Sequence, residues 1–192
     1  MIRVIDKFLP ASLATKLLEE VEDFGFPWYY KKNNAPRSMA QKITYAKYPL
    51  LIHTLYLNNT PTSQWFNIFN TILFFIEDRF NVNILNIERV KINCVLRTEA
   101  PILYTPHVDT EMQGYTTFVY YLNTSDGCTN IYNERKVCND NGLQDTNSLT
   151  LIKQIQPVHN SILRFDSNQY HSYLSPTDCD RRLIVNLMVK LQ

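Results

Sequence analysis

The chain has 192 residues and a net charge of +1, and 45% of its residues are hydrophobic and 12% aromatic. This composition predicts a single globular domain with a sizeable core and excludes a disordered chain. A net charge so close to zero gives no overall electrostatic field that would attract a nucleic acid.

The N-terminus, from Met1 to Lys7, has charged residues every few positions and no apolar stretch, so it lacks the pattern of a signal peptide. The longest apolar runs, such as residues 72–76, are too short to cross a bilayer. We therefore expect a cytoplasmic protein with no membrane partner. The four cysteines form no C-x-x-C pair, which favours free thiols, although Cys128 and Cys138 flank a polar loop and could pair if oxidised.

The first part of the chain, residues 1–86, is predicted to be a largely helical support region. Residues 2–6 alternate like a short strand, and a helix is predicted to begin at Pro10 and to end before Gly25 and Pro27. A second helix is predicted over residues 63–80, because its apolar side chains recur at helical spacing. These side chains are Trp65, Ile68, Phe69, Ile72, Phe75 and Ile76.

The remainder, residues 87–192, is predicted to be rich in β-strands. β-Branched, aromatic and alternating residues predict strands over residues 89–96, 116–122, 148–155, 161–165 and 183–189. Several short strands separated by turns are typical of an antiparallel sandwich or jelly roll. The fold class is therefore mainly β with flanking helices. With no internal repeat and no linker, residues 1–192 are expected to form one domain.

Two polar segments stand out between these elements. Residues 28–48 combine five basic residues with five aromatic ones and contain no acid, which is typical either of a nucleic-acid contact or of a solvated surface. Residues 133–147 form a long polar stretch, and loops of that length often serve as lids or binding segments. Both segments are candidates for contacting a substrate.

The candidate metal ligands begin with His107 and Asp109. Residues two apart on an extended chain project to the same side, so an imidazole and a carboxylate can reach one ion. A histidine and an aspartate two residues apart also occur easily by chance, so this pair alone is weak evidence of a metal site. The third candidate, His171, follows the strand at 161–165 and a short turn. With His171 the ligand set consists of two histidines and one carboxylate. That set leaves positions open on a non-haem iron(II) ion, whereas a closed zinc site needs a fourth protein ligand.

The candidate cosubstrate site depends on Arg181 and Arg182, which open the strand at 183–189. A guanidinium pointing inward from a core strand requires an anionic partner, and its planar fork matches a carboxylate. Arg182 shares a face with the polar Asn186, which looks like the cavity side, so we favour Arg182. Arg181 remains the alternative, because a β-bulge would exchange the faces.

Taken in order, these residues resemble the 2-oxoglutarate/iron(II) oxygenase superfamily, and within it the prolyl 4-hydroxylase-like branch. The resemblance rests on residues 4–10 followed by a helix, then on His107-Val108-Asp109, residues 119–123, His171 and Arg182. It implies a double-stranded β-helix fold, Fe(II) as the metal, 2-oxoglutarate and O2 as cosubstrates, ascorbate as an accessory reductant, and succinate and CO2 as products.

The resemblance also implies roles for individual residues. His107, Asp109 and His171 would hold the catalytic iron. Arg182 would bind the distal carboxylate of 2-oxoglutarate, helped by the hydroxyl of Tyr121, although Tyr121 fits an ordinary core tyrosine equally well. The cofactor-binding set is completed by Thr117, which shares a strand face with Tyr121, and by Asn186. Two departures from the family concern the sequence Asp126-Gly127-Cys128, where members often have a Gly-Gly pair, and Arg97, where a tyrosine is common.

Three classes of function fit these observations. The first is an oxygenase that hydroxylates a protein or peptide side chain, with proline as the default from the resemblance. The second keeps the chemistry but acts on nucleic acid, as a demethylase or base hydroxylase, which the basic and aromatic residues 28–48 support and the net charge opposes. The third is a non-enzymatic jelly-roll binding protein in which the three ligand candidates are accidental.

Overall fold

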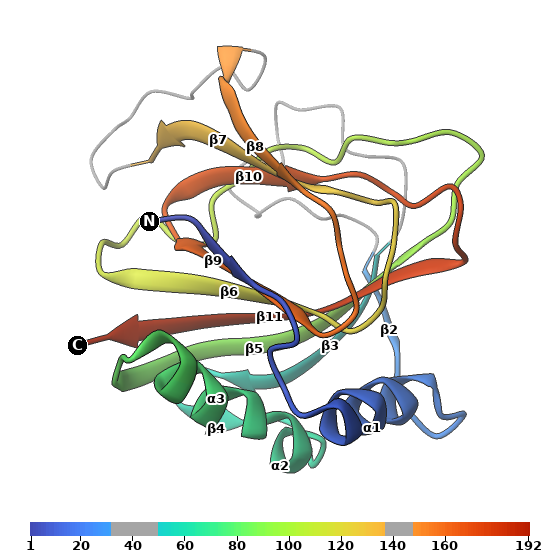
Figure 1. The fold of residues 1–192 in the computed structure, drawn as a ribbon, viewed down its shortest axis with the longest axis vertical. Helices are drawn as coiled ribbons and strands as arrows, with labels where there is room; N and C mark the ends of the chain where they lie inside the picture. The colour runs from blue at the N-terminus through green and yellow to red at the C-terminus, as the bar shows by residue number, and fades with distance from the viewer. Residues whose placement is uncertain (32–49, 137–147) are drawn as a thin grey trace.

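The fold consists of two antiparallel β-sheets with helices on one side (Figure 1). The computed structural model describes residues 1–31, 50–136 and 148–192. The major sheet has the strand order β1-β9-β6-β11-β5-β3-β2, and β4 pairs with β3. Its strands are β1 (Arg3–Ile5), β2 (Tyr29–Lys31), β3 (Leu50–Leu57), β4 (Thr60–Pro61), β5 (Ile84–Leu96), β6 (Tyr115–Tyr121), β9 (Ser161–Asp166) and β11 (Arg181–Leu191). The minor sheet has the order β10-β7-β8, formed by β10 (Gln169–Tyr173), β7 (Thr129–Arg135) and β8 (Leu151–Ile155).

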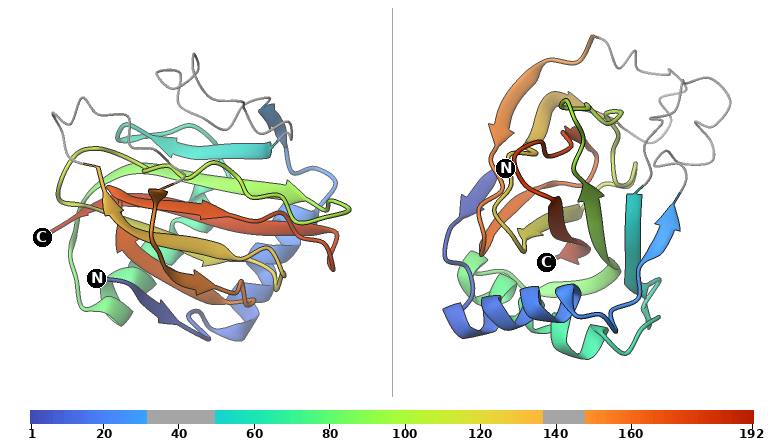
Figure 2. Two further views of the ribbon diagram at one scale, coloured as in Figure 1. Left: turned by 90° about the horizontal axis from the view of Figure 1, so that it is seen from above. Right: turned by 90° about the vertical axis from the view of Figure 1, so that its right-hand side faces the viewer.

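The helices cover the face of the major sheet that points away from the minor sheet (Figures 1 and 2). They are α1 (Ala11–Glu22), α2 (Phe66–Phe69) and α3 (Thr71–Phe80). Ala14, Leu17 and Val21 of α1 are buried on one face, as the predicted apolar spacing requires. Together with apolar residues of β5, β6 and β11, these helices form the largest hydrophobic core.

The helix predicted over residues 63–80 is interrupted, which the apolar spacing does not reveal. The break lies at Asn70, between α2 and α3. There the hydroxyl of Thr71 donates to the carbonyl of Ile68 at 2.8 Å. Hydroxyl and amide side chains compete with the helical hydrogen bonds in this way and favour helix ends over helix interiors. The second helix ends at Asn81, which adopts a left-handed conformation.

The strands β5 and β11 separate two environments. On β11, Leu183, Val185 and Leu187 face the helices and belong to the large core. The alternate residues of β11 face the minor sheet, where a smaller core joins the two sheets. This core contains Val119, Tyr121, Ile131, Ile155, Leu163, Phe165 and Ile184. The arrangement is the jelly roll that the strand pattern predicted, and the space between its sheets is where the site lies.

The N-terminal part differs from the expected helical support region, because β2 and β3 extend the major sheet beyond β5. The strands β7 and β10 were also not predicted. Their residues mix polar and apolar side chains, and they become strands by pairing with each other across a long stretch of sequence. The prediction of one domain over residues 1–192, with a β-helix core over 87–192, stays a prediction.

Several expectations fall on residues outside the described ranges. These are residues 32–48 of the basic and aromatic segment, residues 137–147 of the polar segment, and Cys138. The beginning of the polar segment, residues 133–135, belongs to β7. Cys94, Cys128 and Cys179 are free thiols. Within the described residues, none of the helices has the length and apolar character required to cross a bilayer.

Candidate active site

The segment containing His107 and Asp109 lies between β5 and β6 and is attached to β10 and the turn before it. The backbone N–H of His107 donates to the carbonyl of His171 at 2.9 Å, and the N–H of His171 donates to the carbonyl of His107 at the same distance. The N–H of Asp109 donates to the carbonyl of Ser167 at 2.9 Å. These backbone bonds bring together His107 and His171, which are far apart in the sequence. His171 lies beyond the turn that follows β9, as predicted, and it belongs to the next strand, β10.

The side chains of His107, Asp109 and His171 converge on one point. One ring nitrogen of each histidine and one carboxylate oxygen of Asp109 all lie within 4.8 Å of one another. The Nε2 atom of His171 is 3.8 Å from Oδ2 of Asp109. Within the described residues, no other group of histidine, cysteine, aspartate or glutamate side chains has this arrangement. The three predicted ligands are therefore brought together at a spacing suitable for a metal ion.

The hydrogen bonds of the two imidazoles fix which nitrogen faces that point. Nδ1 of His107 is 3.1 Å from the carbonyl oxygen of Thr105, and Nδ1 of His171 is 3.0 Å from that of Gln169. Because a carbonyl only accepts, both Nδ1 atoms carry the proton, and both Nε2 atoms keep a free lone pair. This is the tautomer that a histidine metal ligand needs, held by its other ring nitrogen.

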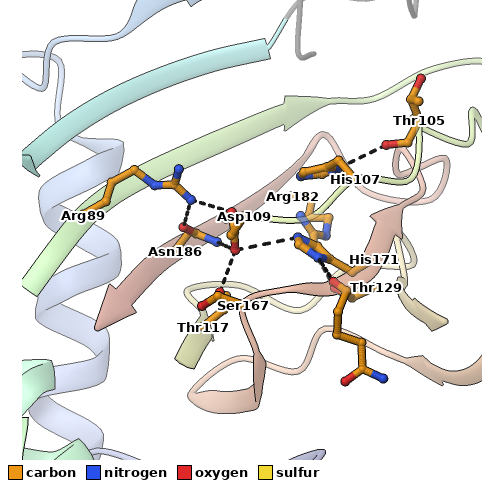
Figure 3. A network of polar contacts seen from close by, with 11 residues as sticks. Arg89, Thr105, His107, Asp109, Thr117, Thr129, Ser167, His171, Arg182 and Asn186 are labelled. Atoms are coloured by element: carbon orange, nitrogen blue, oxygen red, sulfur yellow. Dashed lines mark hydrogen bonds and ion pairs between the residues drawn. The ribbon is translucent and has the colours of Figure 1, made fainter. Parts of the chain in front are cut away.

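The carboxylate of Asp109 is held in place by three side chains (Figure 3). Arg89 donates to Oδ1 at 2.5 Å, and Thr117 donates to Oδ2 at 2.7 Å. Asn186 donates to Oδ2 at 3.4 Å and accepts a second bond from Arg89 at 2.9 Å. Ser167 lies 2.8 Å from the hydroxyl of Thr117, which already donates to Asp109, so Ser167 donates to Thr117.

The electrostatics of the three residues suit a cation. Burial opposes ionisation of Asp109, but Arg89 and the two histidines outweigh it and hold the pKa of the carboxyl well below its usual value. Burial, reinforced by His171, lowers the pKa of His107 to about 3, and burial also lowers the pKa of His171. At neutral pH the site therefore contains two neutral imidazoles and one carboxylate, the protonation states in which these groups ligate metals.

Arg182 points from β11 into the space between the sheets and is only 2% exposed. One guanidinium nitrogen donates to the hydroxyl of Thr129 at 2.7 Å, and Nε has no hydrogen-bond partner among the described residues. The guanidinium lies near the rings of Tyr121 and Tyr173, at 5.8 and 5.1 Å from their centroids. Burial lowers the pKa of Arg182, as expected for a buried cation that has no anionic partner in the part of the chain that the structure describes. The neighbouring Arg181 points outward and forms an ion pair with Glu22.

A single cavity joins the metal-ligand cluster to Arg182. It is lined by Lys91, Asn93, His107, Asp109, Val119, Thr129, His171, Ser172, Tyr173, Arg182, Ile184 and Asn186. Of the predicted cofactor-binding residues, Arg182 and Asn186 line the cavity, whereas Tyr121 and Thr117 contact residues that line it. Tyr121 lies at the arginine end, where its hydroxyl donates to Thr129 at 2.9 Å. Thr117 and Asn186 lie at the other end and contact Asp109.

Five polar residues of the site were not predicted from the sequence: Arg89, Lys91, Asn93, Thr129 and Ser167. A signal was present for the first three, since Arg89, Lys91 and Asn93 alternate with apolar residues on β5. On an outer strand such residues face solvent, but β5 is an inner strand between β11 and β3, and the minor sheet lies over this side of the major sheet (Figure 1). Thr129 and Ser167 carried no local signal, because they reach the site through the pairing of β7, β9 and β10 with their neighbours.

Comparison with known proteins identifies the family. The family model described as "2OG-Fe(II) oxygenase superfamily" matches residues 94–190, which include the three ligand candidates and Arg182. This chain belongs to that superfamily. The oxygenase is accordingly a 2-oxoglutarate-dependent dioxygenase that uses Fe(II) and 2-oxoglutarate, and this excludes the non-enzymatic binding protein.

Solved structures share the fold of this oxygenase at low sequence identity. A prolyl hydroxylase from Trichoplax adhaerens, in complex with a hypoxia inducible factor peptide, has a TM-score of 0.60 and 15% identity, covering 98% of this chain and 83% of that one. A 2OG-Fe(II) oxygenase family oxidoreductase from Burkholderia pseudomallei has a TM-score of 0.65 and 11% identity, covering 98% of this chain and 85% of that one. A Pseudomonas putida prolyl-4-hydroxylase has a TM-score of 0.55 and 15% identity, covering 98% of this chain and 91% of that one. No curated protein sequence matches the chain. These structures confirm the jelly-roll prediction.

Proposed function

We propose that this oxygenase hydroxylates a side chain of a protein or peptide, with proline as the first candidate, and that His107, Asp109 and His171 hold its iron. One observation carries the proposal. A single cavity has three metal-ligand atoms within 4.8 Å of one another at one end and the buried Arg182 at the other. That pairing suits a cosubstrate with a chelating group and a distal carboxylate.

The three protein ligands fit Fe(II) because they supply two neutral nitrogens and one negative oxygen and leave positions open. When bound there, Fe(II) supplies O2 activation coupled to the decarboxylation of 2-oxoglutarate to succinate and CO2. The role of Arg89, Thr117 and Asn186 is to fix the direction of the Asp109 carboxylate, since all three donate to it. Partners of this kind are worth about 10- to 100-fold in metal affinity or activity.

Arg182 fits the distal carboxylate of 2-oxoglutarate. Thr129 uses its hydroxyl to accept bonds from both Arg182 and Tyr121, which holds the guanidinium at the inner end of the cavity. A guanidinium with an unused Nε–H can form a bidentate pair with a carboxylate. Arg182 therefore orients the cosubstrate and excludes uncharged molecules from the same position.

The choice of a peptide substrate is supported by the similar fold that was solved with a peptide, the Trichoplax adhaerens prolyl hydroxylase. A second candidate, nucleic acid, is favoured by one observation on β2. Tyr29 and Tyr30 are 59% and 66% exposed and precede Lys31, so aromatic and basic side chains lie together at the sheet edge. The net charge of +1 opposes this candidate.

Anaerobic titration tests the metal and cosubstrate sites. The wild type should bind one Fe(II) and develop a weak visible band when 2-oxoglutarate is added. Asp109→Ala should lose both, because it removes the charged ligand, whereas Asp78→Ala, an exposed residue of α3, should keep both. Unchanged iron binding in Asp109→Ala contradicts the ligand assignment.

Mass spectrometry then tests the substrate. The holoenzyme is incubated in air with a library of blocked peptides or with single-stranded oligonucleotides. We expect a mass gain of one oxygen on a peptide, together with succinate formation above the level without peptide. Oxidation of the oligonucleotide alone would transfer the proposal to the nucleic-acid candidate.

A further inference from the structure

Two lysines on the cavity side of the major sheet have no role in the reaction described above. Lys91, on β5, is half-buried and lines the cavity beside Asn186, its partner in the register of β5 and β11. Lys31 is half-buried at the end of β2, on the same side of the sheet. Within the described residues, neither lysine has a salt bridge or a hydrogen bond. Lys91 therefore lies in the cavity, and Lys31 on the same side of the sheet, without an ion-pair partner among the described residues.

The cosubstrate does not provide a counter-charge for these two lysines. Arg89 is already paired with Asp109. The two acid groups of 2-oxoglutarate are matched by Arg182 at one end and by the metal at the other. Lys91 and Lys31 remain without an assigned anionic partner. Burial, followed by repulsion from Arg89, lowers the pKa of Lys91 to about 7, and the same causes lower the pKa of Lys31. An anion beside Lys91 and Lys31 would offset both the burial of their ammonium groups and the repulsion from Arg89.

The neutral side chain of Asn93, beside Lys91, also lacks hydrogen-bond partners among the described residues. Asn93 lies two residues further along β5 on the same face, lines the cavity and is only 9% exposed. Its Oδ1 atom has no hydrogen-bond partner among the described residues, and no hydrogen bond there involves its amide nitrogen either. Because buried amides are normally satisfied, Asn93 indicates a ligand that supplies the missing bonds. A substrate backbone beside an acidic group offers both a donor and acceptors.

We propose that Lys91, Asn93 and Lys31 form a subsite that binds a carboxylate of the prime substrate, so that the enzyme prefers peptides with an acidic residue next to the one it oxidises. This inference rests on the proposed peptide function and names the sequence preference of that same site. A carboxylate fits better than a nucleic-acid backbone, because Lys91 lies inside the cavity and the chain has little net positive charge with which to hold a polyanion.

Equilibrium binding tests the subsite without turnover. The anaerobic holoenzyme, with Fe(II) and 2-oxoglutarate bound, is titrated into two pools of blocked, fluorescein-labelled pentapeptides. The pools are identical except that Glu or Gln flanks a randomised central residue, and binding is followed by fluorescence anisotropy. We expect the wild type to bind the Glu pool about tenfold more tightly, the effect of one hydrogen bond to a charged group.

The variants locate the effect. Lys91→Met should reduce the preference for Glu to less than twofold, and Lys31→Met should reduce it in part. Lys16→Met, an exposed lysine on α1 and the matched control, should leave it unchanged. The visible band with 2-oxoglutarate should be retained in all three variants, which also shows that they are folded.

Three results overturn the inference, and they differ from one another. Equal binding and equal oxidation of the two pools leaves the peptide function intact and removes the subsite. A loss of 2-oxoglutarate affinity in Lys91→Met as large as that in Arg182→Met assigns Lys91 to the cosubstrate. Binding of neither pool, with the band intact, removes the peptide function as well, and tight binding of a single-stranded oligonucleotide then identifies nucleic acid as the substrate.

Discussion

The two faces of β5 and β11 have opposite compositions although they belong to the same strands. Toward the helices, β5 and β11 present Val90, Ile92, Leu183, Val185 and Leu187, which are at most 1% exposed. Toward the minor sheet the same strands present charged and amide side chains, namely Arg89, Lys91, Asn93, Arg182 and Asn186. One face therefore belongs to the large core, whereas the other holds the polar residues of the site beside the smaller core that joins the two sheets. The comparison predicts that mutations on the two faces affect different measurements.

The largest expected effect is on the polar face, at Arg182. Replacing it by methionine should weaken 2-oxoglutarate binding by at least about 30-fold, because a carboxylate loses its buried charged partner. The free energy of unfolding should stay the same or increase, since an unpaired buried charge is removed. Calorimetric titration and denaturant unfolding measure the two quantities. Arg181→Met is the matched control, and a similar loss of affinity there would contradict the assignment of faces.

The opposite result is expected on the apolar face. Leu187→Ala should cost about 2–5 kcal/mol of unfolding free energy, the range for removing a buried leucine side chain. The folded fraction should bind 2-oxoglutarate with unchanged affinity. Urea unfolding combined with titration below the unfolding transition tests both statements. A large loss of affinity with little loss of stability would show that the faces are not separate in function.

A smaller effect is expected from Arg89, which supports the site indirectly. In the wild type the depressed pKa of Asp109 keeps the carboxylate ionised as the pH falls. Because its pKa is lower in the folded state, the ionised carboxylate contributes stability above its unfolded pKa and loses it as the pH falls through the folded pKa. Arg89→Met should move the acid limb of metal binding upward by about one pH unit or more.

The pH profile of Mn(II) binding measures this shift. Arg89→Lys keeps the positive charge, so its acid limb should lie between those of the wild type and Arg89→Met. A profile that is identical in Arg89→Met and in the wild type would show that Arg89 has only a packing role.

The smallest expected effect is at Gly127, where the sequence departs from the Gly-Gly pair of the family. A Cβ atom at this position would lie 2.6 Å from the carbonyl oxygen of Leu174 and 3.1 Å from Cδ of Arg182. Gly127→Ala should therefore displace Arg182 and weaken 2-oxoglutarate binding several-fold, in line with an overpacking cost of about 1–3 kcal/mol. At Gly25 the closest atom belongs to the flexible side chain of Asp23, so Gly25→Ala should have no effect.

Much of the fold and part of the site could be predicted from the sequence. The alternation on β11 indicated which of its faces is apolar, and the order of His107, Asp109, His171 and Arg182 indicated the chemistry. Arg89 could not be assigned, because its distance from Asp109 depends on the register of β5 against β11. The strand β3 was missed for a related reason, since a short apolar run does not distinguish strand from helix until its pairing with β5 is known.

The hydrogen bonds around Asp109 have a consequence for how the protein acquires its metal. Arg89, Thr105 and Gln169 orient the carboxylate and both imidazoles, so among the described residues the three ligand side chains are directed by protein groups. A preformed site of this type discriminates weakly among divalent ions of similar size, so the identity of the ion is set by cellular supply as much as by the protein.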